Sequence, residues 1–347
     1  MRIFSETENR KKISVLRHIP SHIEYTCGTP AIAYFSDGSS CALGCLGCVN
    51  PKCMRFDTQE IVCSEAENFP SDHSLNVCPV EALSWDVELD IPMVNMKKCI
   101  NCGICINRCP VGAIYFNGTV KVNDTLSDKI ISGAANSAVT ALQTEQLALL
   151  NSVRKSGQPI IESNKLFQSI YEKLLKVKSN YHNIIARNLL ISLGCRSAMR
   201  RIGDIYTRMD AVYSSTDRCF GAVEVEFGRD TLDASRGILD DVAVLNTRYG
   251  INKEINIPLV VCLQLPNARQ GYWQVVKDIK IVENISINTM TIGAMMLLNW
   301  NNCLFIPDNS TYYFDYDNMD LRSAIFRQIR RNLHVSERFL GILEPMK

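Results

Sequence analysis

The chain has 347 residues, of which 46% are hydrophobic and 21% are charged, and its formal net charge is +1 at pH 7. This length fits two or three globular domains, and the balanced charge neither requires nor excludes a nucleic-acid partner. Of the 15 cysteines, 11 precede residue 110. A chain of this size needs no disulfide framework, so the uneven distribution indicates a separate cysteine-rich domain.

The distribution of apolar residues along the chain favours a cytoplasmic protein without membrane contact. The first twelve residues are polar and charged and lack the apolar core of a secretory signal peptide. The longest late apolar stretch, residues 290–300, is interrupted by Gly293 and Asn299 and is too short to span a bilayer.

The most informative segment is a cysteine run near residue 100. Cys99, Cys102, Cys105 and Cys109 are spaced C-x2-C-x2-C-x3-C, and Pro110 follows them. Three closely spaced thiolates can hold one [4Fe-4S] cluster, while the fourth cysteine of such a run ligates another cluster. The run therefore predicts a second C-P and a second group of cysteines.

Both are present upstream of the run. Residues 78–83 match residues 109–114 in the pattern C-P-V-x-A-aliphatic, and Trp85 corresponds to Phe116. This is an internal repeat of one cluster-binding half. The thiols of the first half come from an early group: Cys41, Cys45, Cys48 and Cys53.

These residues resemble the bacterial-type ferredoxins with two [4Fe-4S] clusters, over residues 30–120. The resemblance implies an α+β ferredoxin-like domain in which Cys99, Cys102 and Cys105 share one cluster with Cys78. It also implies that Cys109 completes a second cluster with three early cysteines. Cys45, Cys48 and Cys53 are preferred because the first two keep the first spacing of the family.

The early group departs from the family pattern in two ways. Four residues separate Cys48 from Cys53, where the family has two. A further 24 residues separate Cys53 from Cys78. A set of Cys41, Cys45 and Cys48 is therefore an alternative, and Cys63 is a third candidate. Zinc also accepts four thiolates, but it does not need the doubled C-P, so iron–sulfur is preferred.

The composition changes after the repeat. Residues 121–162 are rich in Ser, Asn, Thr and Ala, with a helix expected near 141–153, and we interpret them as a connector. The expected domains are therefore 1–120, the connector, and 163–347.

The last domain has the pattern of a mixed sheet flanked by helices. Ser163 can cap a helix, and later elements follow from apolar spacing and turn signals. The expected elements are helices over 163–175, 181–193 and 231–249, a hairpin of 210–213 with 220–227, a strand over 258–263 and a basic helix over 321–333. The last strand is reached through a helical crossover, which predicts parallel pairing.

Acidic residues gather on the predicted hairpin. Strand alternation puts Glu224 and Glu226 on one face, and antiparallel pairing brings Asp210 beside Glu224. Such carboxylates repel one another unless a cation lies among them, and their hard oxygens suit Mg²⁺. Asp204 is a second-ranked ligand. The alternative is an ordinary edge strand whose carboxylates face solvent.

Residues 165–300 resemble the PD-(D/E)XK restriction-endonuclease-like superfamily in the order of their elements. Residues 208–210 stand where that superfamily has Pro-Asp, and residues 224–226 stand where it has Glu-x-Lys. The resemblance implies an α/β restriction-endonuclease-like domain in which Asp210 and Glu224 ligate Mg²⁺. The catalytic set is then Asp210, Glu224 and Glu226.

Glu226 replaces the lysine of that pattern, and Arg229 or Lys253 could supply the missing charge. Other arginines could contact DNA phosphates, although a solvated surface explains them equally well. They lie near the hairpin and on the terminal helix: Arg196, Arg200, Arg201, Arg208, Arg327, Arg330 and Arg331.

Three functions follow from these patterns. The first is a Mg²⁺-dependent DNA endonuclease, of restriction or anti-phage defence type, with two [4Fe-4S] clusters that brace it, sense redox state or dock a partner. Its partners would be DNA and a redox or defence-system protein. The second is a ferredoxin-type electron-transfer protein with a C-terminal partner-docking domain and no nuclease activity. The third is a DNA-binding protein without turnover. The sequence does not predict the oligomeric state.

Overall fold

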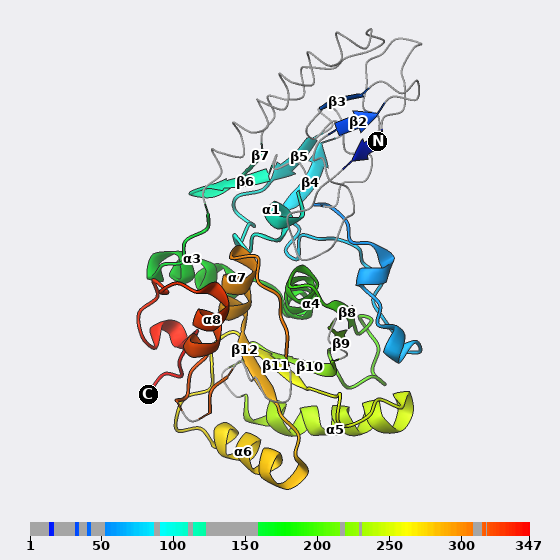
Figure 1. Cartoon of the computed structure of the whole chain (residues 1–347), viewed down its shortest axis with the longest axis vertical. Helices are drawn as coiled ribbons and strands as arrows, with labels where there is room; N and C mark the ends of the chain where they lie inside the picture. Colours follow the sequence, from blue (N-terminus) through cyan, green and yellow to red (C-terminus); the bar gives the residue numbers. More distant parts are fainter. Residues whose placement is uncertain are drawn as a thin grey trace. The chain divides into compact units, whose positions relative to one another are not determined.

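The structure is a computed structural model, shown in Figure 1. For the strands before residue 50, and for Ile91, only the backbone is described. The described residues are 14–16, 32–34, 40–42, 53–86, 91–109, 114–122, 159–215, 219–228, 231–307, 314–316 and 318–347. The chain divides into two compact units, one of residues 1–56 with 76–160 and one of residues 57–75 with 161–347. Each unit is described by itself.

In its described residues, the first unit contains short strands and one short helix. A three-stranded antiparallel sheet and two hairpins make up its strands. The elements are β1 (Ser14–Leu16), β2 (Ile32–Tyr34), β3 (Ser40–Ala42), β4 (Leu83–Asp86), β5 (Ile91–Val94), α1 (Ile104–Arg108), β6 (Ile114–Asn117) and β7 (Thr119–Val122). Leu83 and Ile114, which match in the sequence repeat, are the first residues of β4 and β6. The repeat is therefore a pair of equivalent hairpins.

Cysteines form part of the buried core of this unit. One cluster of buried residues consists of Cys53, Ala82, Cys99, Cys109, Ile114 and Val120, and among the described residues Phe56, Val77, Ile100 and Ile104 are buried as well. Where cysteines of a small domain bind a metal group, that group contributes to the stability of the domain.

The second unit contains a five-stranded mixed sheet in the order β12-β11-β10-β9-β8. Strands β8, β9 and β10 are antiparallel neighbours, and β10, β11 and β12 run parallel. The strands are β8 (Arg196–Met199), β9 (Ala211–Ser214), β10 (Phe220–Glu226), β11 (Leu259–Cys262) and β12 (Asn288–Thr291).

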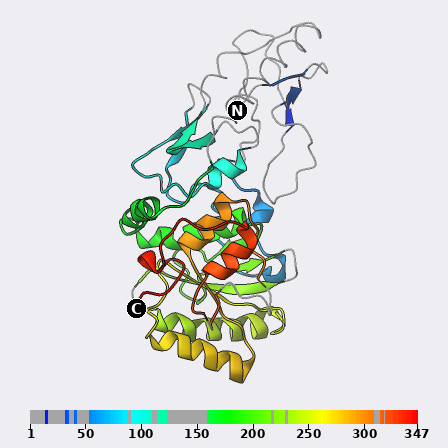
Figure 2. The same ribbon diagram turned by 60° about the vertical axis from the view of Figure 1, so that its left-hand side comes forward.

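Helices cover both faces of this sheet. They are α3 (Asn164–Leu174), α4 (His182–Ser192), α5 (Leu232–Tyr249), α6 (Gly271–Glu283), α7 (Ile292–Trp300) and α8 (Arg322–Ile329), with single turns η2 (Thr58–Glu60), η3 (Ser64–Ala66), η4 (Ser179–Tyr181) and η5 (Phe339–Gly341). In Figure 1 and Figure 2, α5 and α6 lie on one side of the sheet and α4 and α7 on the other. Both faces of β11 are consequently buried.

The predicted mixed sheet with flanking helices is confirmed for this unit. Ser163 caps α3 by accepting the N–H of Leu166 at 3.2 Å, and α4 ends before Gly194, whose φ is +90°. The basic helix is shorter than expected and ends at Ile329, because Arg330 takes a left-handed φ of +57°. Arg331 beyond it forms a bidentate ion pair with the buried Glu162, so it is not free to contact phosphates.

The segment 57–75 differs from the sequence-based boundary, since it belongs to the second unit. Asp72 donates its N–H to the carbonyl of Met199 at 2.7 Å, and the Cys63 thiol lies 3.6 Å from the carbonyl oxygen of Arg196. Cys63 therefore packs beside the β-sheet of the second unit and not among the cysteines of the first. The helix expected near residues 141–153 lies outside the described residues.

Within the described part of the chain, we find no helix with the length and apolar character that crossing a membrane requires.

Candidate functional site

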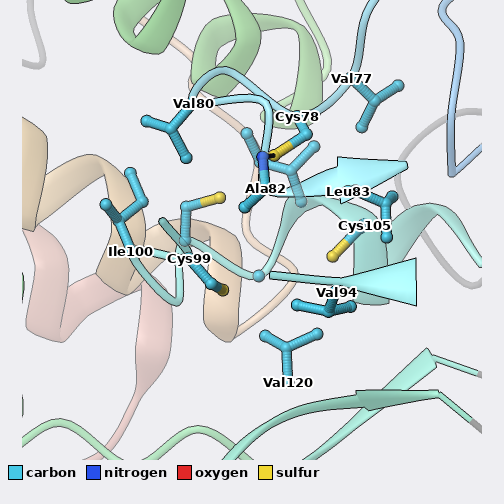
Figure 3. A pocket seen from close by; sticks show the side chains of 13 residues that line it. Val77, Cys78, Val80, Ala82, Leu83, Val94, Cys99, Ile100, Cys105 and Val120 are labelled. Carbon is cyan, nitrogen blue, oxygen red and sulfur yellow. Dashed lines mark hydrogen bonds between the residues drawn. The ribbon is translucent and has the colours of Figure 1, made fainter. Parts of the chain in front are cut away.

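Four cysteines line one cavity in the first unit (Figure 3). Cys78 follows the β-bridge at Asn76, whereas Cys99, Cys102 and Cys105 come from the loop before α1 and from α1 itself. The cavity has about 370 Å³ of empty space, counting the part open to solvent. Its other lining residues are Val77, Val80, Ala82, Leu83, Val94, Ile100, Gly103, Ile104 and Val120. The structure thus brings together the four cysteines predicted to share one cluster.

The loop of the cysteine run reverses direction through left-handed residues. Asn101 has a φ of +57° and Gly103 a φ of +82°, and Gly103 is the N-cap of α1. These two turns allow thiols at positions 99, 102 and 105 to line the same cavity. Figure 3 shows the sulfur atoms of Cys78, Cys99 and Cys105 turned toward a common space.

A chain of backbone hydrogen bonds joins the remote Cys78 to the cysteine run. The N–H of Ala82 donates to Sγ of Cys78 at 3.1 Å, and its carbonyl accepts the N–H of Asn95 at 2.7 Å. The carbonyl of Asn95 in turn accepts the N–H of Cys99 at 2.9 Å. Because N–H donors to cluster sulfurs stabilise negative charge, this chain both positions Cys78 and affects the potential of a bound cluster.

The turn that directs the N–H of Ala82 toward Sγ of Cys78 contains a residue with a strained, left-handed backbone conformation. Glu81 has a φ of +52°, which is unusual for a residue with a side chain. The matching position of the sequence repeat is Gly112, and glycine is the residue type for which a positive φ carries no steric cost.

In the absence of a bound cation, the cysteine site favours thiols over negatively charged thiolates. Burial raises the pKa of Cys102 and of Cys105, and the nearby thiols of Cys78 and Cys99 raise both further. Metal binding to such a site releases these protons, because only the thiolate is a ligand.

The donor set fits a cluster better than a single ion. In the described residues, no group of three or more His, Cys, Asp or Glu side chains is arranged to hold one metal ion. Tetrahedral zinc needs all four sulfurs about 2.3 Å from one point. Four thiols around a shared cavity, in the spacing of the ferredoxin run, suit the larger [4Fe-4S] group.

The second predicted cluster is described only in part. Cys53 and Cys109 are both buried in the core of the first unit. Cys45 and Cys48 lie outside the described residues, and of Cys41 only the backbone is described. The choice among the early cysteines therefore stays a prediction.

In the second unit, the structure brings Asp210 beside Glu224, as the hairpin pattern predicts. Ala211 pairs with Val223, and the N–H of Val225 donates to Oδ2 of Asp210 at 3.0 Å. The other oxygen of Asp210 accepts from Asn183 Nδ2 at 2.8 Å and from an Arg200 guanidinium nitrogen at 3.2 Å.

Sequence reasoning missed a further carboxyl group in this region. Asp241 is 2% exposed and lies on the buried face of α5 with Ile238, Val242 and Leu245. Burial raises its pKa to about 7. The signal was available, because the second of two consecutive aspartates falls on the apolar stripe of an amphipathic helix.

Burial, together with the nearby carboxyls of Asp210 and Asp241, raises the pKa of Glu224 to about 8. Glu226 instead accepts the N–H of Gly228. As noted above, these acidic groups are not arranged around one metal position in the described residues. The predicted Mg²⁺ site therefore stays a prediction. The charge of Asp210 is balanced by its ion pair with Arg200.

Other residues expected at the acidic site have different roles. Lys253 pairs with Glu283 at 3.2 Å, next to the Asn256–Phe220 bridge at the opposite end of β10. It therefore cannot replace the lysine of the Glu-x-Lys pattern. Asp204 accepts the N–H groups of Tyr206 and Thr207 and so shapes the β8–β9 loop. Arg229 lies outside the described residues.

Residues 92–115 match the model of a 4Fe-4S binding domain, which covers the cysteine run and the surrounding strands. This part of the chain is therefore a ferredoxin-type iron–sulfur domain.

Three relatives share sequence with the chain. An uncharacterised ferredoxin of Methanocaldococcus jannaschii is 32% identical over 90 residues, which are 24% of this chain and 56% of that protein. The polyferredoxin-like subunit of an aliphatic sulfonate oxidoreductase of Pyrococcus furiosus is 32% identical over 79 residues, 20% of this chain and 44% of that protein. Component A of hydrogenase-4 of Escherichia coli is 39% identical over 66 residues, 19% of this chain and 30% of that protein.

The chain thus covers about half or less of the length of these relatives. No solved structure matches it.

The left-handed turn at Glu81 generates a prediction. Glu81→Gly keeps the turn, whereas Glu81→Val raises its cost because a β-branched side chain disfavours positive φ. We expect the valine variant to release cluster iron to a chelator several-fold faster than the glycine variant and the wild type, measured by absorbance. Glu67→Val, at a residue with a φ of −54°, is the matched control. Equal release from both Glu81 variants would contradict this role.

The acidic site generates a second prediction. The folded pKa of Glu224 is about 8 and its unfolded pKa about 4.3, so wild-type stability falls as pH rises between these values. Glu224→Gln should remove the share of this decline that Glu224 contributes, while that of Asp241 remains. The variant should exceed the wild type by about 2 kcal/mol near pH 8, less than the full shift implies because Glu224 is partly exposed. Urea unfolding at several pH values measures it, with the exposed Glu337→Gln as control. Parallel pH profiles for wild type and Glu224→Gln would refute the assignment.

Proposed function

We propose that this protein is a ferredoxin-type electron carrier. Its N-terminal unit would hold [4Fe-4S] clusters that exchange single electrons with a partner protein, and its C-terminal unit would serve as a partner-docking domain. The observation that carries this proposal is the cavity lined by Cys78 together with Cys99, Cys102 and Cys105. The relatives agree with it, since one is named a ferredoxin and another a polyferredoxin-like subunit of an oxidoreductase.

The residues around the cavity suit this function. A bound cluster supplies reversible one-electron chemistry. The cysteine thiolates would hold it, the aliphatic lining would exclude water from its sulfurs, and the Ala82 N–H would stabilise negative charge on Cys78. Donors and burial of this kind are the means by which proteins set cluster potentials.

We propose two clusters per chain. The fourth cysteine of the run, Cys109, follows the helix α1 that carries Cys105, and unlike the other three it does not line the cavity. It shares a cluster of buried residues with Cys53. The doubled C-P pattern assigns each such cysteine to the cluster of the other half. A second cluster would thus be completed by Cys109 with Cys53 and two of the early cysteines, for which Cys45 and Cys48 are preferred.

Iron and sulfide analysis of the anaerobically purified chain tests this arrangement. Two clusters give about eight iron and eight sulfide per chain. Cys78→Ala should lose about four of each, because it removes the remote ligand of one cluster and leaves the other set complete. Cys262→Ala, at a buried cysteine of the second unit, is the matched control and should keep the full content. Full iron content in Cys78→Ala would contradict the proposed ligand set.

A second candidate function, metal-dependent cleavage of DNA, is favoured by the pairing of Asp210 with Glu224. The elements α4, β9, β10, α5 and β11 follow one another in the order expected for the PD-(D/E)XK resemblance, and β8 is an additional strand between α4 and β9. A divalent ion could replace Arg200 as the cation next to Asp210 and could activate water for phosphodiester hydrolysis. None of the three relatives is named as a nuclease, so this is the weaker candidate.

A plasmid cleavage assay tests the second candidate. The full chain with Mg²⁺ should nick plasmid DNA, and EDTA should stop the reaction. Asp210→Asn and Glu224→Gln should each reduce the rate at least about a hundredfold, because each removes a carboxylate from the metal. Glu254→Gln, at an exposed position, is the control. Cleavage that persists in both variants, or no cleavage by the wild type, would remove this candidate.

A further inference from the structure

Two methionines and two lysines are exposed beside the cysteine cavity. Met93, on β5, is 46% exposed and Met96 is 38% exposed. Lys97 and Lys98, which follow in the same turn, are also exposed. These four residues are called the β5 platform below. Exposed methionines are uncommon, and they are used at surfaces that adapt to a partner.

The β5 platform is the outer side of a wall of the cavity. Successive side chains of a strand point to opposite faces. Val94 lines the cavity, so the preceding Met93 points away from it on the same strand. Lys98 directly precedes Cys99, which also lines the cavity. A protein docked on the platform would therefore lie one strand away from a bound cluster.

The turn that carries the platform is held in one conformation. Oδ1 of Asn95 accepts the N–H groups of Lys97 at 3.0 Å and of Lys98 at 3.3 Å. The carbonyl of Asn95 accepts the N–H of Cys99 at 2.9 Å. A preorganised surface loses less conformational entropy on binding than a flexible one.

The platform itself is positively charged. Residues 91–109 contain no Asp or Glu, and their cationic residues are Lys97, Lys98 and Arg108. The Arg108 side chain is buried, with its guanidinium 4.6 Å from the centre of the Phe56 ring. The residue that pairs with Met93 is the neutral Ser84, and the described acidic residues near β4 are the exposed Glu81 and the half-buried Asp86, which pairs with Ile91. The exposed charges of the platform itself are therefore those of its two lysines.

We infer that the β5 platform docks an acidic redox protein, whose carboxylates surround an apolar contact for the two methionines. This inference rests on the proposed electron-transfer function. The lysines would steer the encounter, and the methionines would bury apolar area next to the cluster wall. The reaction itself moves one electron from the reduced cluster to the oxidised cofactor of the partner and breaks no covalent bond. A nucleic acid would engage the lysines but would leave the methionines uncovered.

The test uses the full chain with its clusters and a charge-reversed double variant, Lys97→Glu with Lys98→Glu. A matched control makes the same charge change at exposed positions of the second unit, Arg236→Glu with Lys277→Glu. The probes are an acidic flavodoxin, a basic cytochrome c and a DNA duplex. Two quantities are measured: the dissociation constant by fluorescence anisotropy, and the rate of electron transfer from the dithionite-reduced chain in stopped flow.

At low salt, the wild type and the control should bind and reduce the flavodoxin at least about tenfold better than the charge-reversed variant does. The variant should prefer cytochrome c, and Met93→Ser with Met96→Ser should weaken flavodoxin binding at all salt concentrations. Equal flavodoxin affinity for the variant and the wild type would overturn the inference. The inference would also be overturned if charge reversal weakened only the binding of DNA. The same holds if its only effect were that the variant no longer self-associates in analytical ultracentrifugation.

Two controls separate this inference from the proposed function. Iron and sulfide contents of each variant must equal those of the wild type. If charge reversal perturbs the cluster, Lys97→Gln with Lys98→Gln takes its place, with an expected effect of about threefold. Failure of the clusters to accept electrons from dithionite would refute the electron-transfer function. Redox-active clusters with no dependence on the platform would refute only the docking surface.

Discussion

The bonding of cysteine thiolates to iron is the interaction on which the N-terminal unit depends. Cysteines belong to its buried core, in which Cys53, Cys99 and Cys109 form one cluster with small and aliphatic side chains. Burial raises the pKa of the cysteines in the cavity, so a chain without metal keeps its thiols protonated and gains nothing from them. Because iron binding deprotonates the same residues and uses them as ligands, it would couple folding of this unit to cluster assembly.

The hydrogen-bonded link from Cys78 through Ala82 and Asn95 to Cys99 explains how a distant cysteine joins the run. A ligand about twenty residues away would otherwise have to be positioned by packing alone. The same link ends in the turn that presents Lys97 and Lys98. One short segment, residues 95–99, thus bears on both cluster geometry and the proposed docking of a partner.

The sequence prediction was most specific for the cysteines, because ligand chemistry imposes short, fixed spacings, and the structure brings four of them to one cavity. The sequence also predicted α3, α4, α5 and the β9–β10 hairpin, whose caps and periodicities are local. It missed β8, which is a short strand of mixed polarity, and α7, which is buried all round and therefore lacks an amphipathic stripe. Three further features depend on tertiary contacts that no local pattern encodes. They are the membership of residues 57–75 in the second unit, the burial of Asp241 and the pairing of Arg200 with Asp210.

Electron transfer by cysteine-bound clusters is tested most directly by an electron paramagnetic resonance titration of the anaerobically prepared full chain against applied potential. We predict a reversible one-electron signal of a reduced [4Fe-4S] cluster, with a midpoint in the low-potential range of ferredoxins, below about −200 mV. A chain that contains only zinc, or clusters that decompose on reduction and do not recover, would contradict the account.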